Sequence, residues 1–108
     1  MIDFSIKQGN TAPAIRSTLK DRNNIPVDIT GAAVRFHMSL ESTGAIKVDG
    51  AASIIDAAAG VVQYSWTGAN TDTAGTYIAE WEVTYSGGTV ETFPSNDYNR
   101  VLIAEKLA

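Results

Sequence analysis

Three glutamates in the second half of the chain are the residues whose type and spacing first suggest catalysis. Glu80 and Glu82 lie two positions apart in an alternating segment, so both point to one face of a strand, and we expect Glu91 to lie near them across a predicted hairpin. Two carboxylates can serve as acid and base in glycoside hydrolysis. That reaction also needs a cleft and stacking aromatic residues on the same face, which the pattern does not supply. A solvated strand face that deters edge-to-edge aggregation is the better interpretation.

His37 is the single histidine, and it shares the polar side of its segment with Arg35. One histidine cannot build a catalytic triad alone, and no serine is set in a Gly-x-Ser-x-Gly turn. The chain has no cysteine, which excludes thiolate nucleophiles, thiolate metal ligands and disulfide bonds. We therefore predict that His37 is an exposed surface residue, and we predict no enzyme activity, no catalytic residue, no cofactor and no metal ligand.

Asn70, Asp72 and Asp97 carry oxygen atoms of the kind that bind calcium in the loops of some sandwich domains. Their spacing is not that of an EF-hand. Asn and Asp are also common in turns for local conformational reasons, so a turn role explains them equally well.

The aromatic residues raise the question of carbohydrate stacking. Trp66 and Trp81 are in phase with apolar neighbours, so we expect both to lie in the core. Tyr98, in the predicted loop 94–99, is the one fair candidate for an exposed aromatic ring that a sugar could contact.

The composition limits the classes of partner. The chain has 108 residues, 44% of them hydrophobic, which fits one globular domain covering residues 1–108. Eight basic and twelve acidic residues give a net charge of −4, and the basic residues form no run, so neither nucleic acid nor an anionic membrane surface is an expected partner. The start of the chain lacks a signal-peptide pattern, and no apolar stretch is long enough to span a membrane, so we expect synthesis in a cytoplasm.

Apolar residues recur at every second position along most of the chain, which predicts strands with one buried and one wet face. In chain order the expected strands are residues 2–7, 15–20, 34–38, 45–48, 51–55, 61–66, 77–85, 90–93 and 100–104. Residues 26–31 form a short extended piece, and residues 57–60 form a turn. About seven to nine short strands without a convincing helix predict an all-β, antiparallel β-sandwich.

The hairpin after Tyr85 has two possible registers. The sequence Ser-Gly-Gly-Thr at 86–89 tolerates the positive φ angles of a tight turn. A two-residue loop would turn Val90 toward the core, whereas a three-residue bulged loop would turn Phe93 inward. The sequence leaves this choice open.

The segment from Thr73 to Tyr77 resembles the tyrosine corner of immunoglobulin-like domains. Gly75 permits a tight turn, and Tyr77 combines an apolar ring for the core with a hydroxyl that must find a partner. In such domains the tyrosine hydroxyl bonds back to the preceding backbone. Ala79 stands where many of them have a cysteine, so the core is expected to be packed without a cross-link.

Three segments read together resemble a named family. They are PVDITGAAVRF at 26–36, DAAAGVVQYSW at 56–66, and residues 72–85 followed by Gly87-Gly88 and Thr92-Phe93-Pro94. Their order and spacing are similar to the N-terminal domain of the phage baseplate upper protein (BppU) family, from about Gly9 to Ile103. The resemblance implies an immunoglobulin-like structural module of tailed-phage virions.

On this basis we expect a virion protein, a small assembly subunit of the tail tip or baseplate. Its partners would be other virion proteins and copies of itself, with residues 2–7 and 105–108 as the contact elements, and no small-molecule substrate. One alternative is a head decoration or head–tail junction protein of the same fold. Another is a carbohydrate-binding or adhesion module that uses Tyr98.

Overall fold

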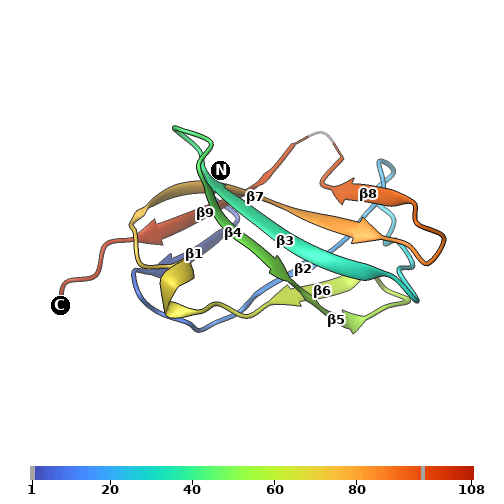
Figure 1. Cartoon of the computed structure of the whole chain (residues 1–108), viewed down its shortest axis with the longest axis horizontal. Coiled ribbons are helices and arrows are strands. Elements are labelled where there is room, and N and C mark those ends of the chain that lie inside the picture. Colours follow the sequence, from blue (N-terminus) through green and yellow to red (C-terminus); the bar gives the residue numbers. More distant parts are fainter. Residues whose placement is uncertain (1, 96) are drawn as a thin grey trace.

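The computed structural model describes residues 2–95 and 97–108, which form two β-sheets stacked face to face (Figure 1). The strands are β1 (Phe4–Lys7), β2 (Ile15–Thr18), β3 (Ala33–Leu40), β4 (Ile46–Ala51), β5 (Ser53–Asp56), β6 (Val61–Tyr64), β7 (Gly75–Thr84), β8 (Val90–Phe93) and β9 (Asn99–Ala104). One turn of 3₁₀ helix, η1 (Gly68–Asn70), precedes β7. The predicted all-β sandwich is confirmed.

The larger sheet is built around β7, the longest strand. Its order is β1-β9-β7-β3-β4, and β8 also pairs with β7. The first half of β7 pairs with β9 and the second half with β8, so these two strands follow one another along a single edge of β7. The loop 94–98 interrupts them, and its Asn96 lies outside the described residues.

One pairing differs from the antiparallel prediction. β1 runs parallel to β9, with Phe4 opposite Val101 and Ile6 opposite Ile103. Ile6 is buried, whereas Phe4 is half-buried and its ring lies 5.8 Å from that of Trp66. The alternating pattern locates a strand and its buried face, but it carries no information about the direction of the partner strand, because the side-chain period is the same in both cases.

The smaller sheet has the order β2-β6-β5, and after β4 the chain passes back into it through β5. The sequence pattern predicted that β4 ends and β5 begins around residues 49–50. In the structure β4 continues to Ala51 and β5 starts at Ser53. Gly50 and Ala51 belong to β4 because they pair with Phe36 and Arg35 of β3. The ring of Tyr64 lies close to Gly50, where a Cβ atom would be 2.9 Å from Cε1 of Tyr64. A small residue is needed where an aromatic ring approaches the backbone.

The core lies between the two sheets. Its buried apolar residues come from both sheets and the connecting segments: Ile6, Ile15, Leu19, Ile29, Val34, Phe36, Met38, Val48, Val62, Trp66, Tyr77, Ala79, Trp81, Val83, Phe93, Val101 and Ile103. Phe36 is at the centre of an aromatic cluster, with ring centroids 4.9 Å from Tyr64 and 4.7 Å from Trp81. The prediction that both tryptophans belong to the core is confirmed.

The hairpin between β7 and β8 adopts the bulged alternative. The amide of Tyr85 donates a 2.8 Å hydrogen bond to the carbonyl of Thr89, which leaves three residues in the loop. Phe93 is therefore buried opposite Trp81, while Val90 is 54% exposed.

Candidate functional site

The turn that leads into β7 is closed by the hydroxyl of Tyr77. This hydroxyl donates a 2.8 Å hydrogen bond to the carbonyl oxygen of Thr73. The tyrosine ring is 2% exposed, so a polar partner inside the protein compensates for the loss of water. The tyrosine corner predicted from the sequence is confirmed, and Ala79 packs in the core behind it.

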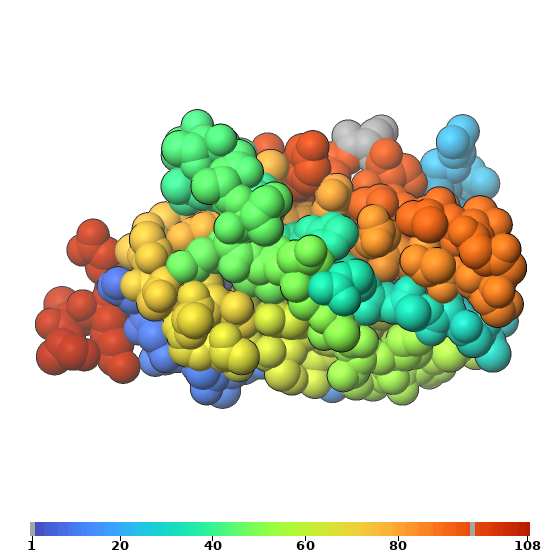
Figure 2. Space-filling model, in the orientation of Figure 1, coloured from blue at the N-terminus to red at the C-terminus, as the bar shows by residue number. Residues whose placement is uncertain are grey.

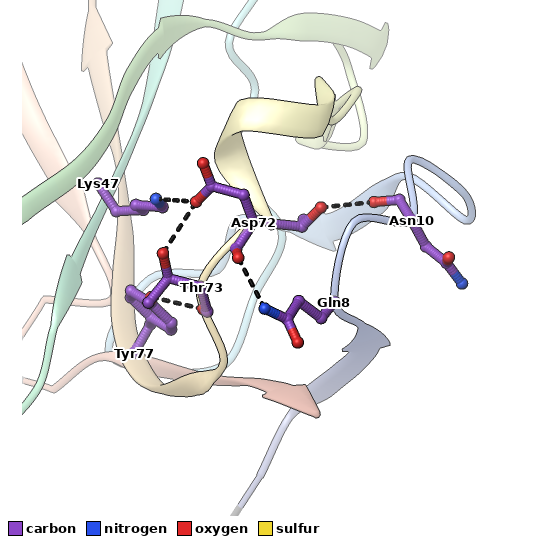
Figure 3. Close-up of polar contacts among 7 residues, drawn as sticks. Gln8, Asn10, Lys47, Asp72, Thr73 and Tyr77 are labelled. Carbon is purple, nitrogen blue, oxygen red and sulfur yellow. Dashed lines mark hydrogen bonds and ion pairs between the residues drawn. The ribbon is translucent and has the colours of Figure 1, made fainter. Parts of the chain in front are cut away.

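A set of polar contacts surrounds this turn (Figure 3). We call these residues the polar corner: Gln8, Asn10, Lys47, Thr71, Asp72, Thr73 and Tyr77. The Asp72 carboxylate accepts hydrogen bonds from Nζ of Lys47 on β4 and, at 2.9 Å, from Oγ1 of Thr73. The Asp72 carbonyl accepts a 2.8 Å bond from Nε2 of Gln8. Thr71 is fully buried, and its hydroxyl donates to the carbonyl of Asn10 at 2.8 Å. The polar corner thus ties β4 and the turn after β1 to the loop before β7.

Two aspartates are held in the ionised form by basic neighbours. The hydrogen bond from Lys47, with that from Thr73, lowers the pKa of Asp72 below its ordinary value of 3.8. On the outer face of the large sheet, the hydrogen bond from Arg35 at 3.0 Å is the main reason that the pKa of Asp49 is also lowered. Carboxylates with lowered pKa values accept protons poorly at neutral pH, so these two act as anchors in ion pairs.

The three candidate calcium ligands have separate partners. Oδ1 of Asn70 accepts hydrogen bonds from the Tyr64 hydroxyl and the Thr67 amide, at 2.9 and 2.8 Å. Asp72 pairs with Lys47, and Asp97 lies 3.5 Å from Arg100. Across residues 2–95 and 97–108, no group of three or more acidic, histidine or cysteine side chains is placed to hold a metal ion. The arrangement favours the turn interpretation of these residues.

The three glutamates are not gathered on one face. Glu80 and Glu82 point outward from β7, whereas Glu91 is directly opposite the buried Val83 and so belongs to the other face of the ladder. The Glu91 carboxylate accepts a 2.8 Å bond from the Tyr85 hydroxyl. Burial and this bond raise the pKa of Tyr85 to about 12. The expected proximity of Glu91 to the other two glutamates was wrong, because the bulged hairpin fixes its register.

The outer face of the large sheet holds a small groove that the sequence did not reveal. It has a volume of about 230 Å³ and we call it the outer-face groove; its lining residues are His37, Met38, Ser39, Ile46, Asp49, Ile78, Glu80 and Tyr98. Figure 2 shows the green turn between β3 and β4 projecting from the molecular body, and Ile46 directly follows this turn.

His37 lies in the middle of this groove's floor. It is opposite Asp49 of β4 on one side and Glu80 of β7 on the other. Its Nε2 is 3.2 Å from the Asp49 carboxylate, and the imidazole is 26% exposed. The prediction of an exposed surface histidine was therefore only half right, because the two neighbouring strands and the contact with Asp49 cover much of the ring.

The two elements predicted to make contacts lie at an edge and an end of the sandwich. Among the described strands β1 pairs only with β9, so its second edge carries no partner strand. After β9 the chain leaves the body of the sandwich (Figure 1), and the side chain of Leu107 is fully exposed. Nζ of Lys7 at the end of β1 lies 3.5 Å from the carbonyl of Glu105, so this end of β1 and the tail are neighbours.

The sequence matches the BppU N-terminal domain family over residues 2–97. This chain belongs to that family. A BppU N-terminal domain is a structural domain associated with the phage baseplate, which makes this chain a virion-associated protein. The resemblance predicted from the three sequence segments is thereby confirmed.

A solved structure with low sequence identity has a fold similar to that of this BppU domain. The crystal structure of CopC from Methylosinus trichosporium OB3b matches 100% of this chain and 89% of that chain, with a TM-score of 0.55 and 12% sequence identity. At that identity the likeness concerns the fold alone. No curated protein matches the sequence. In the part of the BppU domain that the structure describes, no helix has the length and hydrophobicity needed to cross a membrane.

Proposed function

We propose that this BppU domain is an assembly subunit of the tail tip or baseplate of a tailed bacteriophage and acts through protein–protein contacts. The observation that carries the proposal is the family match over residues 2–97. A contact role agrees with the state of three carboxylates that could otherwise take part in chemistry: Asp72 and Asp49 anchor ion pairs, and Glu91 is bonded to Tyr85.

Two surfaces suit such contacts. The second edge of β1 offers backbone groups to which a neighbouring strand can add, a common mode of protein recognition. The tail 105–108 presents Leu107 beyond the sandwich, where a neighbour can bury it. We propose that other virion proteins, and further copies of this chain, occupy these surfaces.

The test is localisation in purified virions by electron microscopy with an antibody or tag, together with reconstruction of the particle. Density for the sandwich in the tail tip or baseplate would support the proposal. Density on the capsid or at its portal would instead establish the head decoration or head–tail junction alternative, and absence from particles would overturn a structural role.

A matched pair of variants tests the contact surface itself. Leu107→Asp should lower incorporation into virions, because it places a charge where an apolar contact is proposed. Ile25→Asp is the control, since Ile25 is 57% exposed and belongs to the turn that begins at Asp21. The light-blue loop after β2 lies at the end of the sandwich opposite the C-terminus (Figure 1). Equal incorporation of both variants would argue against the tail as a contact element.

A second candidate function, carbohydrate binding, rests on one observation. Tyr98 is 45% exposed and lines the outer-face groove beside polar side chains. A glycan array tests it: saturable binding that is lost in Tyr98→Ala would favour a carbohydrate-binding module over a purely structural domain.

A further inference from the structure

Glu80 stands out in the outer-face groove because no basic group in the described part of the chain lies within ion-pair distance of its carboxylate. It is half-buried in the middle of the large sheet. Within residues 2–95 and 97–108, its carboxylate has neither a hydrogen bond to another side chain nor an ion pair. Burying part of a carboxylate without a partner is unfavourable, so a cation that reaches Glu80 would gain binding energy.

The other ionisable groups of the groove, Asp49 and His37, contact each other and are not paired with Glu80. The Asp49 carboxylate is occupied, since Nε of Arg35 lies 3.0 Å and Nε2 of His37 lies 3.2 Å from its Oδ1. Glu80 is opposite His37 in the ladder, but no contact joins their side chains among the described ion pairs. Within the described residues, Glu80 is therefore the carboxylate of the groove that has no basic partner.

The remaining walls are apolar and aromatic. Ile46 is 72% exposed, Tyr98 is 45% exposed, and Ile78 is half-buried between them in the lining. Aliphatic walls suit the methylene stem of a long basic side chain. A tyrosine ring attracts a guanidinium group over its face. The volume of about 230 Å³ is below the range of roughly 300–1,000 Å³ typical of small-molecule pockets and fits one inserted side chain better.

We propose that the outer-face groove receives an arginine side chain from a neighbouring protein of the assembly, which rests on the proposed function for the source of that arginine. The guanidinium forms an ion pair with Glu80 and stacks on Tyr98, while its stem lies on Ile46 and Ile78. Arginine fits better than lysine because its planar group can stack and donate two hydrogen bonds at once. The net charge of −4 favours approach of a basic partner surface.

The experiment uses the isolated, ¹⁵N-labelled chain and needs no knowledge of the partner. The probe is N-acetyl-arginine amide, and the matched probe is N-acetyl-citrulline amide, which has nearly the same shape without the charge. Arginine should cause saturable shifts of the backbone amide signals of His37, Glu80 and Tyr98, with affinity in the millimolar range. Citrulline should bind about fivefold more weakly or worse, the effect of one partly exposed ion pair.

Variants of the groove residues, with one control outside the groove, complete the test. Glu80→Gln should weaken arginine binding by about fivefold, whereas Glu82→Gln, two positions along the same strand face and outside the groove, should leave it unchanged. Tyr98→Ala should weaken it as well, and because the ring is partly exposed the fold should persist.

The proposal is overturned if arginine and citrulline bind equally, if Glu80→Gln has no effect, or if no signal near the groove shifts. A larger response to methyl glucoside than to arginine would also overturn it and would favour the carbohydrate alternative. These results do not depend on where the protein sits in a virion. Failure of the arginine site and failure of the assembly role are thus observed separately.

Discussion

At the residue scale, Tyr77 shows how one side chain fixes a turn. Its ring fills the core of the sandwich, and its hydroxyl reaches back to the Thr73 carbonyl at 2.8 Å. The turn holds Asp72 in position for its ion pair with Lys47. Loss of the hydroxyl would remove the hydrogen bond to the Thr73 carbonyl without changing the apolar packing.

We therefore expect Tyr77→Phe to lower the free energy of unfolding by about 1 kcal/mol, the usual net value of one hydrogen bond. The measurement is urea unfolding, in which the midpoint should fall at an unchanged slope. Tyr98→Phe is the control: that ring is 45% exposed, and its effect should stay within about 0.5 kcal/mol. Equal midpoints for the two variants would contradict a stabilising tyrosine corner.

At the element scale, the turn between β5 and β6 depends on Gly60. Its φ angle is +70°, and an added Cβ atom would lie 2.6 Å from the Val27 carbonyl oxygen and 3.0 Å from that of Leu19. Backbone atoms cannot move aside as a flexible side chain can. The turn therefore brings the small sheet against the extended segment that precedes β3, at a distance only glycine allows.

We expect Gly60→Ala to destabilise the protein by at least about 3 kcal/mol, because an unfavourable left-handed conformation and a backbone collision add together. Gly9→Ala separates the two effects: Gly9 has φ of +80° with open space around its Cβ position, so only the conformational cost of about 1–2 kcal/mol remains. Thermal and urea unfolding of both variants provide the comparison. Similar losses for the two would show that the close contact contributes nothing.

At the scale of the whole molecule, ion pairs join different strands and loops of the sandwich. Asp72 links the loop before β7 to Lys47 on β4, and Asp49 links β4 to Arg35 on β3. Both aspartates have pKa values below the ordinary 3.8 in the folded protein. The stabilisation from each is complete above about pH 4 to 5, and it is lost as the pH falls through the lowered folded-state pKa.

We expect the urea midpoint to be insensitive to these two groups between pH 7 and pH 5 and to fall below about pH 4. Asp72→Asn should lower the midpoint at pH 7 and make the remaining acid dependence shallower. Both carboxylates are exposed, so salt should reduce the effect. The same acid dependence in Asp72→Asn as in the original protein would contradict the role assigned to this ion pair.

The sequence predicted those features of the fold that depend on local patterns. Alternation located the strands and their buried faces, as with Val34, Phe36 and Met38 on β3, because the side-chain period of a strand is two whatever it pairs with. The Gly75 and Tyr77 pair indicated the tyrosine corner, because a turn and a buried hydroxyl leave recognisable residues.

The tertiary structure decided what depends on pairing between distant segments. The parallel direction of β1, the hairpin register that buries Phe93, and the partners of Gln8 and Lys47 in the polar corner come from which strand lies beside which. His37, Glu80 and Tyr98 are far apart in sequence, and each alone is unremarkable. They share the outer-face groove because β3 and β7 are neighbours and the loop after β8 folds over them, an arrangement that no local pattern encodes.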